Sequence, residues 1–453
     1  MSQSKEGRPE LKLSPLDNTN AFISGSWALT SPEAGRRMLK PGFVDEFLQV
    51  HDGYAILMNT SLQWVFADNS GWKLAPGRSK KWPLGIECTA DKSKTERLWF
   101  MMALWDGRME SPHVLVYVDM DAGRFEVWGH HSVFDGTAYF DFVRRWSAFA
   151  ETPSNGSSGF GPVTVSRDWL LSQNFPKATN SQNEAVWVEL PGPVMSVVGK
   201  VMFNLIGLIE KFLFPNLLQT LLSRMIGPMV MLEVTMSGLH DVKPEDGDIS
   251  RLSVNDIATA RIWRAYLQAR VTHKKIKPTG RSRCALAVDV REALSCPEGA
   301  VANCVQIACA GAEIEEVLSE SEAQTAGRVR RCVEQLRHRQ SVHEFMGWLL
   351  SIPLHCLKTV FHTVATPGSA DVGVSSWVRM YPRQIAGGSF SPLSFRALKL
   401  DTFDGLTVLT DSKTGDPNEI VALVGSHPGE YMETLKKQFE AQNCQVAVLS
   451  PLP

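Results

Sequence analysis

The spacing of hydrophobic and polar positions changes its period close to residue 130. Residues 114–120 (VLVYVDM) and 124–129 (RFEVWG) are short β-rich runs, and residues 121–123 (DAG) between them are typical of a hairpin turn. From residue 137 to 149 the apolar positions recur instead at a helical spacing, at Ala138, Tyr139, Phe142, Val143, Trp146 and Phe149. The pattern therefore predicts a hairpin, a short strand-to-helix turn and an amphipathic helix.

The rest of the chain alternates strands and helices. Residues 1–150 are β-rich with interspersed turns, and the Ser/Gly/Pro/Asn-rich residues 152–161 predict a surface loop or the start of a crossover. The charged residues 315–338 predict a solvated outer helix, and residues 430–442 predict a final helix. Strands are predicted near residues 284–290, 373–379, 396–401, 406–410 and 419–424.

The turn before the first of these helices carries candidate chemistry. It reads HHSVFDG, and of eleven histidines only His131 has an aspartate, Asp135, four positions later. A neutral imidazole on a rigid turn is suited to general-base catalysis near pH 7, and we expect Gly136 to allow a tight backbone at the helix start. The simpler alternative is a histidine pair that is only packed or solvated.

Motifs along most of the chain carry a family resemblance. HHSVFDG is accompanied by further motifs in other parts of the chain. They are LSPLD at residues 13–17, the run 253–270 with its A-x-x-W-R core, the D-x-R of 289–291 followed by Pro297 and Asn303, and the S-S-W of 375–377. With these motifs the chain resembles the BAHD acyltransferase superfamily in its fungal trichothecene-acetyltransferase-like branch. One glycine of that pattern is replaced here by Ala302.

The resemblance implies a fold and a domain order. It implies an α/β protein of two chloramphenicol-acetyltransferase-like domains, each a mixed β-sheet flanked by helices, with a channel between them. We expect an N-terminal domain over residues 1–185, an apolar crossover or lid over 186–245, and a C-terminal domain over 246–453.

The same resemblance implies an activity. It implies transfer of an acyl group, acetyl by default, from acyl-CoA as co-substrate to a hydroxyl or amine, with no tightly bound cofactor and no metal. His131 matches the position of the family's general base. Asp135 is expected to have a structural role, through an ion pair with Arg291. Ser375 and Trp377 are expected to stabilise the oxyanion of the tetrahedral intermediate. The residues expected to be structural near the site are His130, Gly136, Arg291 and Asn303.

One departure from the family pattern keeps other functions open. The D-F-G-W-G box should follow Trp377, but residues 388–393 read GSFSPL, in which only Phe390 survives. The first alternative is an enzyme of the same fold that catalyses a CoA-independent cyclisation, isomerisation or pericyclic step. The second is a binding module that receives acyl groups from a carrier protein.

An apolar block covers residues 194–234. Charges at Lys200, Glu210, Lys211 and Arg224 keep every uncharged run below the roughly 18 residues that a bilayer span needs, and Pro215 should kink a helix there. We favour helices that pack on the core or cover a hydrophobic acceptor. The alternative is a peripheral membrane contact, whose polar face would usually hold more Lys and Arg.

Composition narrows the class of protein. The 453 residues are 44% hydrophobic, enough for sizeable cores, and the net charge of −2 argues against a nucleic-acid binder. Eight cysteines without a C-x-x-C pair, and no cationic-then-apolar start, predict a cytoplasmic protein with reduced thiols. Thirteen Trp and twenty-one Phe are compatible with a bulky hydrophobic acceptor, such as a terpenoid or polyketide alcohol of secondary metabolism. The resemblance favours a monomer.

Overall fold

The structure is a computed structural model. It describes residues 11–12, 22–29, 31–58, 60–64, 72–76, 86–91, 113–131, 133–152, 160–176, 230–245, 247, 249–351, 370–380, 384–385, 388–389, 404–412 and 416–449. Several predicted features lie outside these residues, namely the motif at 13–17, Phe390, the strand at 396–401 and residues 194–229 of the apolar block.

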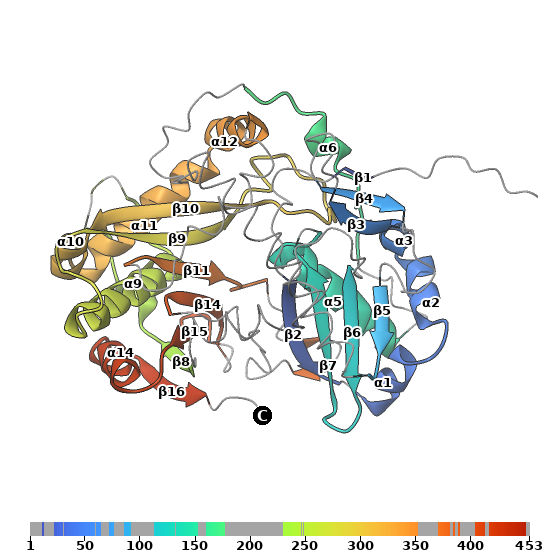
Figure 1. The fold of residues 1–453 in the computed structure, drawn as a ribbon, viewed down its shortest axis with the longest axis horizontal. Coiled ribbons are helices and arrows are strands. Elements are labelled where there is room, and N and C mark those ends of the chain that lie inside the picture. Colours follow the sequence, from blue (N-terminus) through green and yellow to red (C-terminus); the bar gives the residue numbers. More distant parts are fainter. Residues whose placement is uncertain are drawn as a thin grey trace, which may run out of the picture.

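A seven-stranded mixed sheet organises the C-terminal half (Figure 1). Its order is β10-β9-β11-β14-β15-β8-β16. Strand β11 runs parallel to both β9 and β14, and the other neighbours pair antiparallel. The strands are β8 (Val230–Met236), β9 (Arg281–Asp289), β10 (Val305–Glu313), β11 (Val372–Ser376), β14 (Leu406–Asp411), β15 (Ile420–Ser426) and β16 (Gln445–Leu449).

Three helices pack on this sheet and on one another. They are α9 (Val254–Thr272), α11 (Glu322–Arg337) and α14 (Glu430–Ala441). Helix α9 is buried over most of its length and starts with a capping box, in which Ser253 and Asp256 exchange hydrogen bonds with each other's backbone amides. Shorter helices α10 (Ile314–Ser319) and α12 (Arg339–Ser351) complete this half.

A four-stranded mixed sheet organises the N-terminal half. Its order is β2-β7-β6-β5, with only β5 and β6 parallel. The strands are β2 (Phe22–Ala28), β5 (Ile86–Thr89), β6 (Val114–Asp119) and β7 (Arg124–His130). The predicted hairpin is present between β6 and β7, where Gly123 adopts a positive φ of 61°.

Helix α5 (Gly136–Glu151) packs on this sheet through its apolar face. The hydroxyl of buried Tyr139 donates to the carbonyl of Val127 in β7 at 2.8 Å. On the other side Trp146 and Phe142 meet Phe47 of helix α2 (Phe43–Val50). The neighbouring elements are α1 (Pro32–Met38), a 3-10 turn at Asp52–Tyr54 and α3 (Ala55–Met58).

Small elements complete the described structure, and some of them link the two halves. Sheet β1-β4-β3 is formed by Leu11–Lys12, Trp72–Pro76 and Thr60–Trp64. Helix α6 (Asp168–Leu171) places Leu170 in the C-terminal core, while Val301, from the loop after β9, belongs to the N-terminal core. Strand β13 (Gly388–Ser389), paired with β12 (Gln384–Ile385), contacts β2. A 3-10 turn at Leu239–Asp241 follows β8.

The predicted α/β class with two mixed sheets flanked by helices is confirmed, but two local predictions are wrong. Helices α1 and α2 lie in the part expected to be β-rich. The single helix expected over 315–338 is two helices, α10 and α11, because Ser321 caps a new helix start with Gln324. Helix α11 is also not simply solvated, since it buries one side that includes Ala326, Val329 and Leu336.

Among the residues that the structure describes, no helix is both long and apolar enough to span a membrane. The last five residues of the apolar block, 230–234, begin strand β8, where Leu232 and Val234 are fully buried.

Candidate functional site

The histidine turn connects β7 to α5, as predicted. Strand β7 ends at His130, whose side chain lies outside the description, and α5 begins at Gly136. Val133 and Phe134 are fully buried and anchor the turn in the N-terminal core, while His131 is partly exposed. The turn is thus packed against the N-terminal core through Val133 and Phe134, and it leaves the imidazole of His131 partly exposed.

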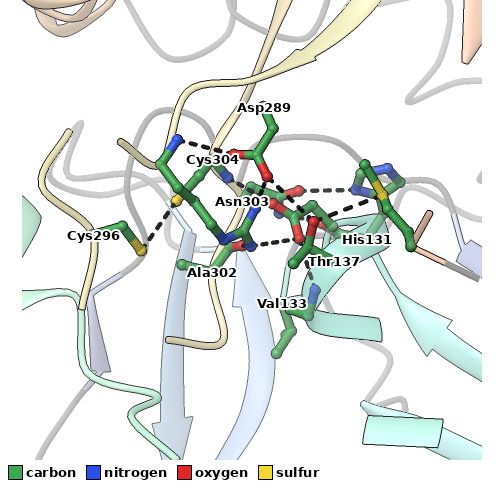
Figure 2. A network of polar contacts seen from close by, with 12 residues as sticks. His131, Val133, Thr137, Asp289, Cys296, Ala302, Asn303 and Cys304 are labelled. Carbon is green, nitrogen blue, oxygen red and sulfur yellow. Dashed lines mark hydrogen bonds and ion pairs between the residues drawn. The ribbon is translucent and has the colours of Figure 1, made fainter. Parts of the chain in front are cut away.

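A loop from the other half meets this turn. Residues 290–304 connect β9 to β10 and lie over the N-terminal half (Figure 1). The loop is held at its neck, where the amide of Val290 donates to the carbonyl of Cys304 at 2.8 Å. It is also held at its tip, where Thr164 and Val301 pair through a 2.8 Å backbone hydrogen bond. Figure 2 shows the polar network that forms where loop and turn meet.

His131 is oriented by Asn303 of this loop. Nδ1 of His131 lies 3.0 Å from Oδ1 of Asn303, and Nδ2 of Asn303 donates to the backbone carbonyl of His131. That second bond fixes which way the amide points, so the atom facing the imidazole is an acceptor. Nδ1 of His131 must therefore carry the hydrogen, which leaves the basic lone pair on Nε2.

Asp135 is a fully buried clamp. Oδ1 accepts from Nη2 of Arg291 at 2.6 Å and from the amide of Ala138 at 3.0 Å, and Oδ2 accepts from the amide of Cys304 at 2.9 Å. The carboxylate therefore caps α5 and ties the turn to the loop with one side chain. The predicted ion pair with Arg291 is present.

Arg291 is held on three sides. It contacts Asp135, Oδ2 of Asp289 at 3.2 Å, and the carbonyl of Ala302 at 3.1 Å. Burial disfavours its charge, but the carboxylate of Asp135 outweighs burial and raises the pKa of the guanidinium. Removing one partner of a buried pair such as this typically costs about 3–5 kcal/mol.

Gly136 does not have the backbone role that the sequence suggested. It is the first residue of α5, its φ is not in the left-handed region, and a Cβ there would meet only Sδ of Met380 at 3.5 Å. The tight position is Gly129, at the end of β7 just before the turn, where a Cβ would come within 2.9 Å of the ring of Tyr139.

Ser375 and Trp377 lie at the end of β11, next to the start of α5. The indole Nε1 of Trp377 donates to Oγ of Ser375 at 3.1 Å, and its ring meets Phe140 of α5 edge-on at 5.3 Å. Met380, whose amide bonds to the carbonyl of Trp377 at 3.1 Å, also reaches Thr137 with its sulfur. The S-S-W motif is thus packed against α5, with Trp377 both a packing residue and a donor.

Sequence reasoning missed three residues at this site. Arg167, 1% exposed, donates to the carbonyl of Val133 at 3.2 Å and supports the turn from below. Cys296 and Cys304 bracket the end of the loop with their sulfur atoms 3.8 Å apart. For the two cysteines the sequence signal was their position close after the D-x-R motif. Arg167 had no such signal, because its contact with Val133 depends on how the chain folds. Within the described ranges, no three His, Cys, Asp or Glu side chains are grouped to hold a metal ion.

Comparisons with known proteins agree with this architecture. Residues 234–442 match the Transferase family. An anthranilate N-benzoyltransferase of Dianthus caryophyllus is 25% identical over 321 residues, which are 68% of this chain and 63% of the relative. The matched segment is a little under half of the chain, and over it the chain resembles the Transferase family. The predicted resemblance to BAHD acyltransferases is confirmed, although the match spans less than two thirds of the length of this relative.

Solved structures share the fold of this chain. TRI101 of F. sporotrichioides, complexed with coenzyme A and T-2, has a TM-score of 0.66 at 14% identity and covers 98% of this chain and 100% of its own. TRI101 of F. graminearum, complexed with coenzyme A and T-2 mycotoxin, reaches 0.63 at 14% identity with the same coverage. Vinorine synthase reaches 0.53 at 14% identity over 97% of this chain and 95% of its own.

Proposed function

We propose that this chain is an acyltransferase that moves an acyl group, acetyl by default, from acyl-CoA to a hydroxyl or amine of a bulky hydrophobic secondary metabolite. The match of residues 234–442 to the Transferase family supports the class of reaction. The donor and the class of acceptor are supported by solved relatives, which hold coenzyme A together with T-2 or deoxynivalenol.

The observation that carries the proposal is the hydrogen bond from Nδ1 of His131 to Oδ1 of Asn303, at 3.0 Å. A general base for acyl transfer must offer an unprotonated nitrogen to the acceptor. By fixing the hydrogen on Nδ1, Asn303 leaves the lone pair of Nε2 for this task. Asn303 therefore has the orienting role that an aspartate has in serine hydrolases.

The reaction follows from this arrangement. Nε2 of His131 takes the proton of the acceptor as its oxygen or nitrogen attacks the thioester carbonyl, and a tetrahedral intermediate forms. The carbon–sulfur bond then breaks, and the imidazolium returns the proton to the departing thiolate of coenzyme A. Because both substrates react across one imidazole, the step needs no acyl-enzyme.

Negative charge on the intermediate requires a hydrogen-bond donor. The single N–H of the Trp377 indole is directed at Ser375. Oγ of Ser375 accepts that bond, so its own hydrogen can point elsewhere. We therefore assign oxyanion support to the Ser375 hydroxyl and an orienting role to Trp377.

The substrates are proposed to meet between the two halves. His131 comes from the N-terminal sheet and Asn303 from the C-terminal hairpin loop, so a channel along this junction would reach Nε2. The predicted boundary at residue 185 and a cytoplasmic monomer acting in fungal-type secondary metabolism remain parts of the proposal. The lid is proposed over residues 194–229 only, and the boundary expected at residue 245 moves to before Val230, because residues 230–236 form β8 inside the C-terminal sheet. Size-exclusion chromatography with light scattering tests the monomer.

The decisive experiment offers purified protein a panel of acyl-CoAs and measures both binding and release of free coenzyme A, separated by chromatography. The wild type is compared with His131→Ala and with His240→Ala, a matched change at an exposed histidine. We expect one or more acyl-CoAs to bind to all three proteins, with slow hydrolysis or transfer that only His131→Ala abolishes.

Other results have distinct meanings. If no acyl-CoA binds to well-folded protein, the acyl-CoA assignment fails and the CoA-independent enzyme remains. Activity only with an acylated carrier protein would establish the carrier-dependent alternative. Equal turnover in wild type and His131→Ala would remove His131 from the chemistry.

A further inference from the structure

We propose that Cys296 and Cys304 are a redox-active thiol pair that an oxidant converts to a disulfide, and that this disulfide lowers turnover at His131. Disulfide formation is independent of the proposed function, whereas the effect on turnover rests on it. The pair lies at the end of the loop that carries Asn303, on the side of the network away from His131 (Figure 2).

The two sulfur atoms are already in contact. Sγ of Cys304 donates to Sγ of Cys296 at 3.8 Å, and a disulfide needs about 2.05 Å, so the sulfur atoms must approach by almost half of their present distance. Cys296 follows a turn in which Ser295 has a φ of 53°, and it is partly exposed. Cys304 is fully buried. One thiol is thus open to a small oxidant, and the other is placed to react with it.

The surroundings make the two thiols chemically different. The hydrogen bond from Cys304 is the largest effect that lowers the pKa of Cys296, and the nearby charge of Arg291 acts in the same direction. The same hydrogen bond, together with burial, raises the pKa of Cys304. Cys296 is therefore the thiolate that attacks first, and Cys304 is the resolving thiol.

The other cysteines among the residues that the structure describes lack this combination. Burial raises the pKa of Cys88 to about 12, that of Cys309 to about 11 and that of Cys332 to about 12. Cys88 is partly exposed, as Cys296 is, but its pKa is raised rather than lowered. It is therefore the matched control for Cys296.

The chemical step is balanced with hydrogen peroxide as the oxidant. The Cys296 thiolate attacks one oxygen, the O–O bond breaks, a sulfenic acid forms, and hydroxide leaves and takes up the proton that Cys296 had lost. Cys304 then attacks the sulfenic sulfur, the S–S bond forms, the S–O bond breaks, and water departs with the Cys304 proton. Two thiols are oxidised and one peroxide is reduced to two waters.

The disulfide acts on the site through the backbone. Cys304 donates its amide to Asp135 and directly follows Asn303, while Cys296 donates its amide to the carbonyl of Arg291 at 2.9 Å. Movement of either cysteine therefore pulls on one half of the Asp135–Arg291 clamp. Asn303, which precedes the moving residue, then loses its alignment with His131.

The test treats the full chain with dilute hydrogen peroxide, blocks remaining thiols, and maps peptides by mass spectrometry. We expect a crosslinked peptide joining Cys296 to Cys304 that dithiothreitol releases. Amide hydrogen exchange supplies a readout without substrate, because release of the Cys304 amide from Asp135 should speed its exchange in the oxidised protein. Turnover should fall by roughly tenfold or more and return on reduction.

Variants distinguish the outcomes. Cys296→Ser should retain its turnover under peroxide, and Cys88→Ser should be inhibited as the wild type is. Absence of the Cys296–Cys304 crosslink in folded protein would overturn the thiol pair, and a crosslink without loss of turnover would overturn its coupling to His131. If the reduced protein transfers no acyl group, the proposed function fails, while the crosslink and amide exchange still decide the redox proposal.

Discussion

Asn303 and His131 are 172 positions apart in the chain and hold each other through two hydrogen bonds, one to the imidazole and one to the backbone. We expect Asn303→Ala to lower kcat by roughly ten- to a hundredfold with little change in KM, because the base loses its fixed tautomer while substrate contacts remain. Steady-state kinetics measures this. Asn418→Ala, at an exposed loop position, is the control. An unchanged kcat in Asn303→Ala would contradict the orienting role.

The Asp135 clamp can be compared with a second buried ion pair, Arg270–Asp404, whose closest atoms are 3.3 Å apart. Both Asp135→Asn and Asp404→Asn should lower the free energy of unfolding, by up to about 3–5 kcal/mol. Only Asp135→Asn should also lower kcat per folded molecule. Chemical denaturation and kinetics on the same preparations measure both effects, and equal losses of kcat would show that Asp135 acts only through stability.

Two glycines that flank the histidines, Gly129 and Gly136, should differ in how far alanine lowers the free energy of unfolding. At Gly129 the new Cβ would lie 2.9 Å from the buried Tyr139 ring, which is fixed by its bond to Val127, so we expect Gly129→Ala to cost about 1–3 kcal/mol. At Gly136 the Cβ meets only Met380, and alanine favours the helix, so stability should change by less than about 0.5 kcal/mol. Thermal denaturation compares them. A destabilised Gly136→Ala protein would mean that this glycine has a backbone role.

The assignment of Ser375 and Trp377 predicts unequal losses. Ser375→Ala removes the proposed donor to the oxyanion and should lower kcat by about 10²–10³-fold. Trp377→Phe keeps the edge contact with Phe140 but loses the N–H that orients Ser375, so its effect should be smaller. Kinetics of both variants tests the order. A larger loss in Trp377→Phe would exchange the two roles.

His51 predicts how stability depends on pH. It is 4% exposed beside Arg145 and Phe47, and burial, followed by the charge of Arg145, lowers its pKa from 6.5 to about 4. Between these values the unfolded chain binds a proton that the folded chain does not. The folded state should therefore lose up to about 1.4 kcal/mol per unit as pH falls from 6.5 toward 4.

The variant His51→Asn isolates this contribution. The asparagine oxygen can still accept from Arg145, but the side chain no longer titrates, so the slope of stability against pH should flatten in this window. Urea denaturation at several pH values measures the slope, and His240→Asn, at an exposed position, is the control. A slope unchanged by His51→Asn would assign the dependence to other groups.

Helices were predictable from the sequence where the apolar spacing and the N-terminal cap point to the same boundaries. The helix after HHSVFDG follows from its apolar spacing and from Asp135, which caps it. Helix α1 also had a start signal, Ser31 followed by Pro32 and Glu33, but it spans only two turns and carries too short a pattern to stand out against strands. The break between α10 and α11 was hidden because both helices are charged and only the Ser321 cap separates them.

The site was predictable only as far as motifs extend. Asp135 and Arg291 could be paired through the family pattern, but their distance in sequence is 156 positions, and spacing alone contains no information on such a contact. The same applies to Arg167, which reaches Val133 only because the segment after α5 folds back under the turn. The role of Gly136 was misjudged because a glycine before a helix suggests strain, whereas here the neighbouring space is open.

The long loop between β9 and β10 also has a consequence for synthesis of the chain on the ribosome. The HHSVFDG turn leaves the ribosome well before Arg291 and Asn303 have been made. The nascent N-terminal half therefore carries the complete motif, but it lacks both the guanidinium that pairs with Asp135 and the side-chain amide that orients His131. A product that stops before residue 303 would match a motif search and lack the means to fix the tautomer of His131. The motif thus locates the proposed base, and a hairpin loop that is translated much later supplies Asn303, the residue that fixes its tautomer.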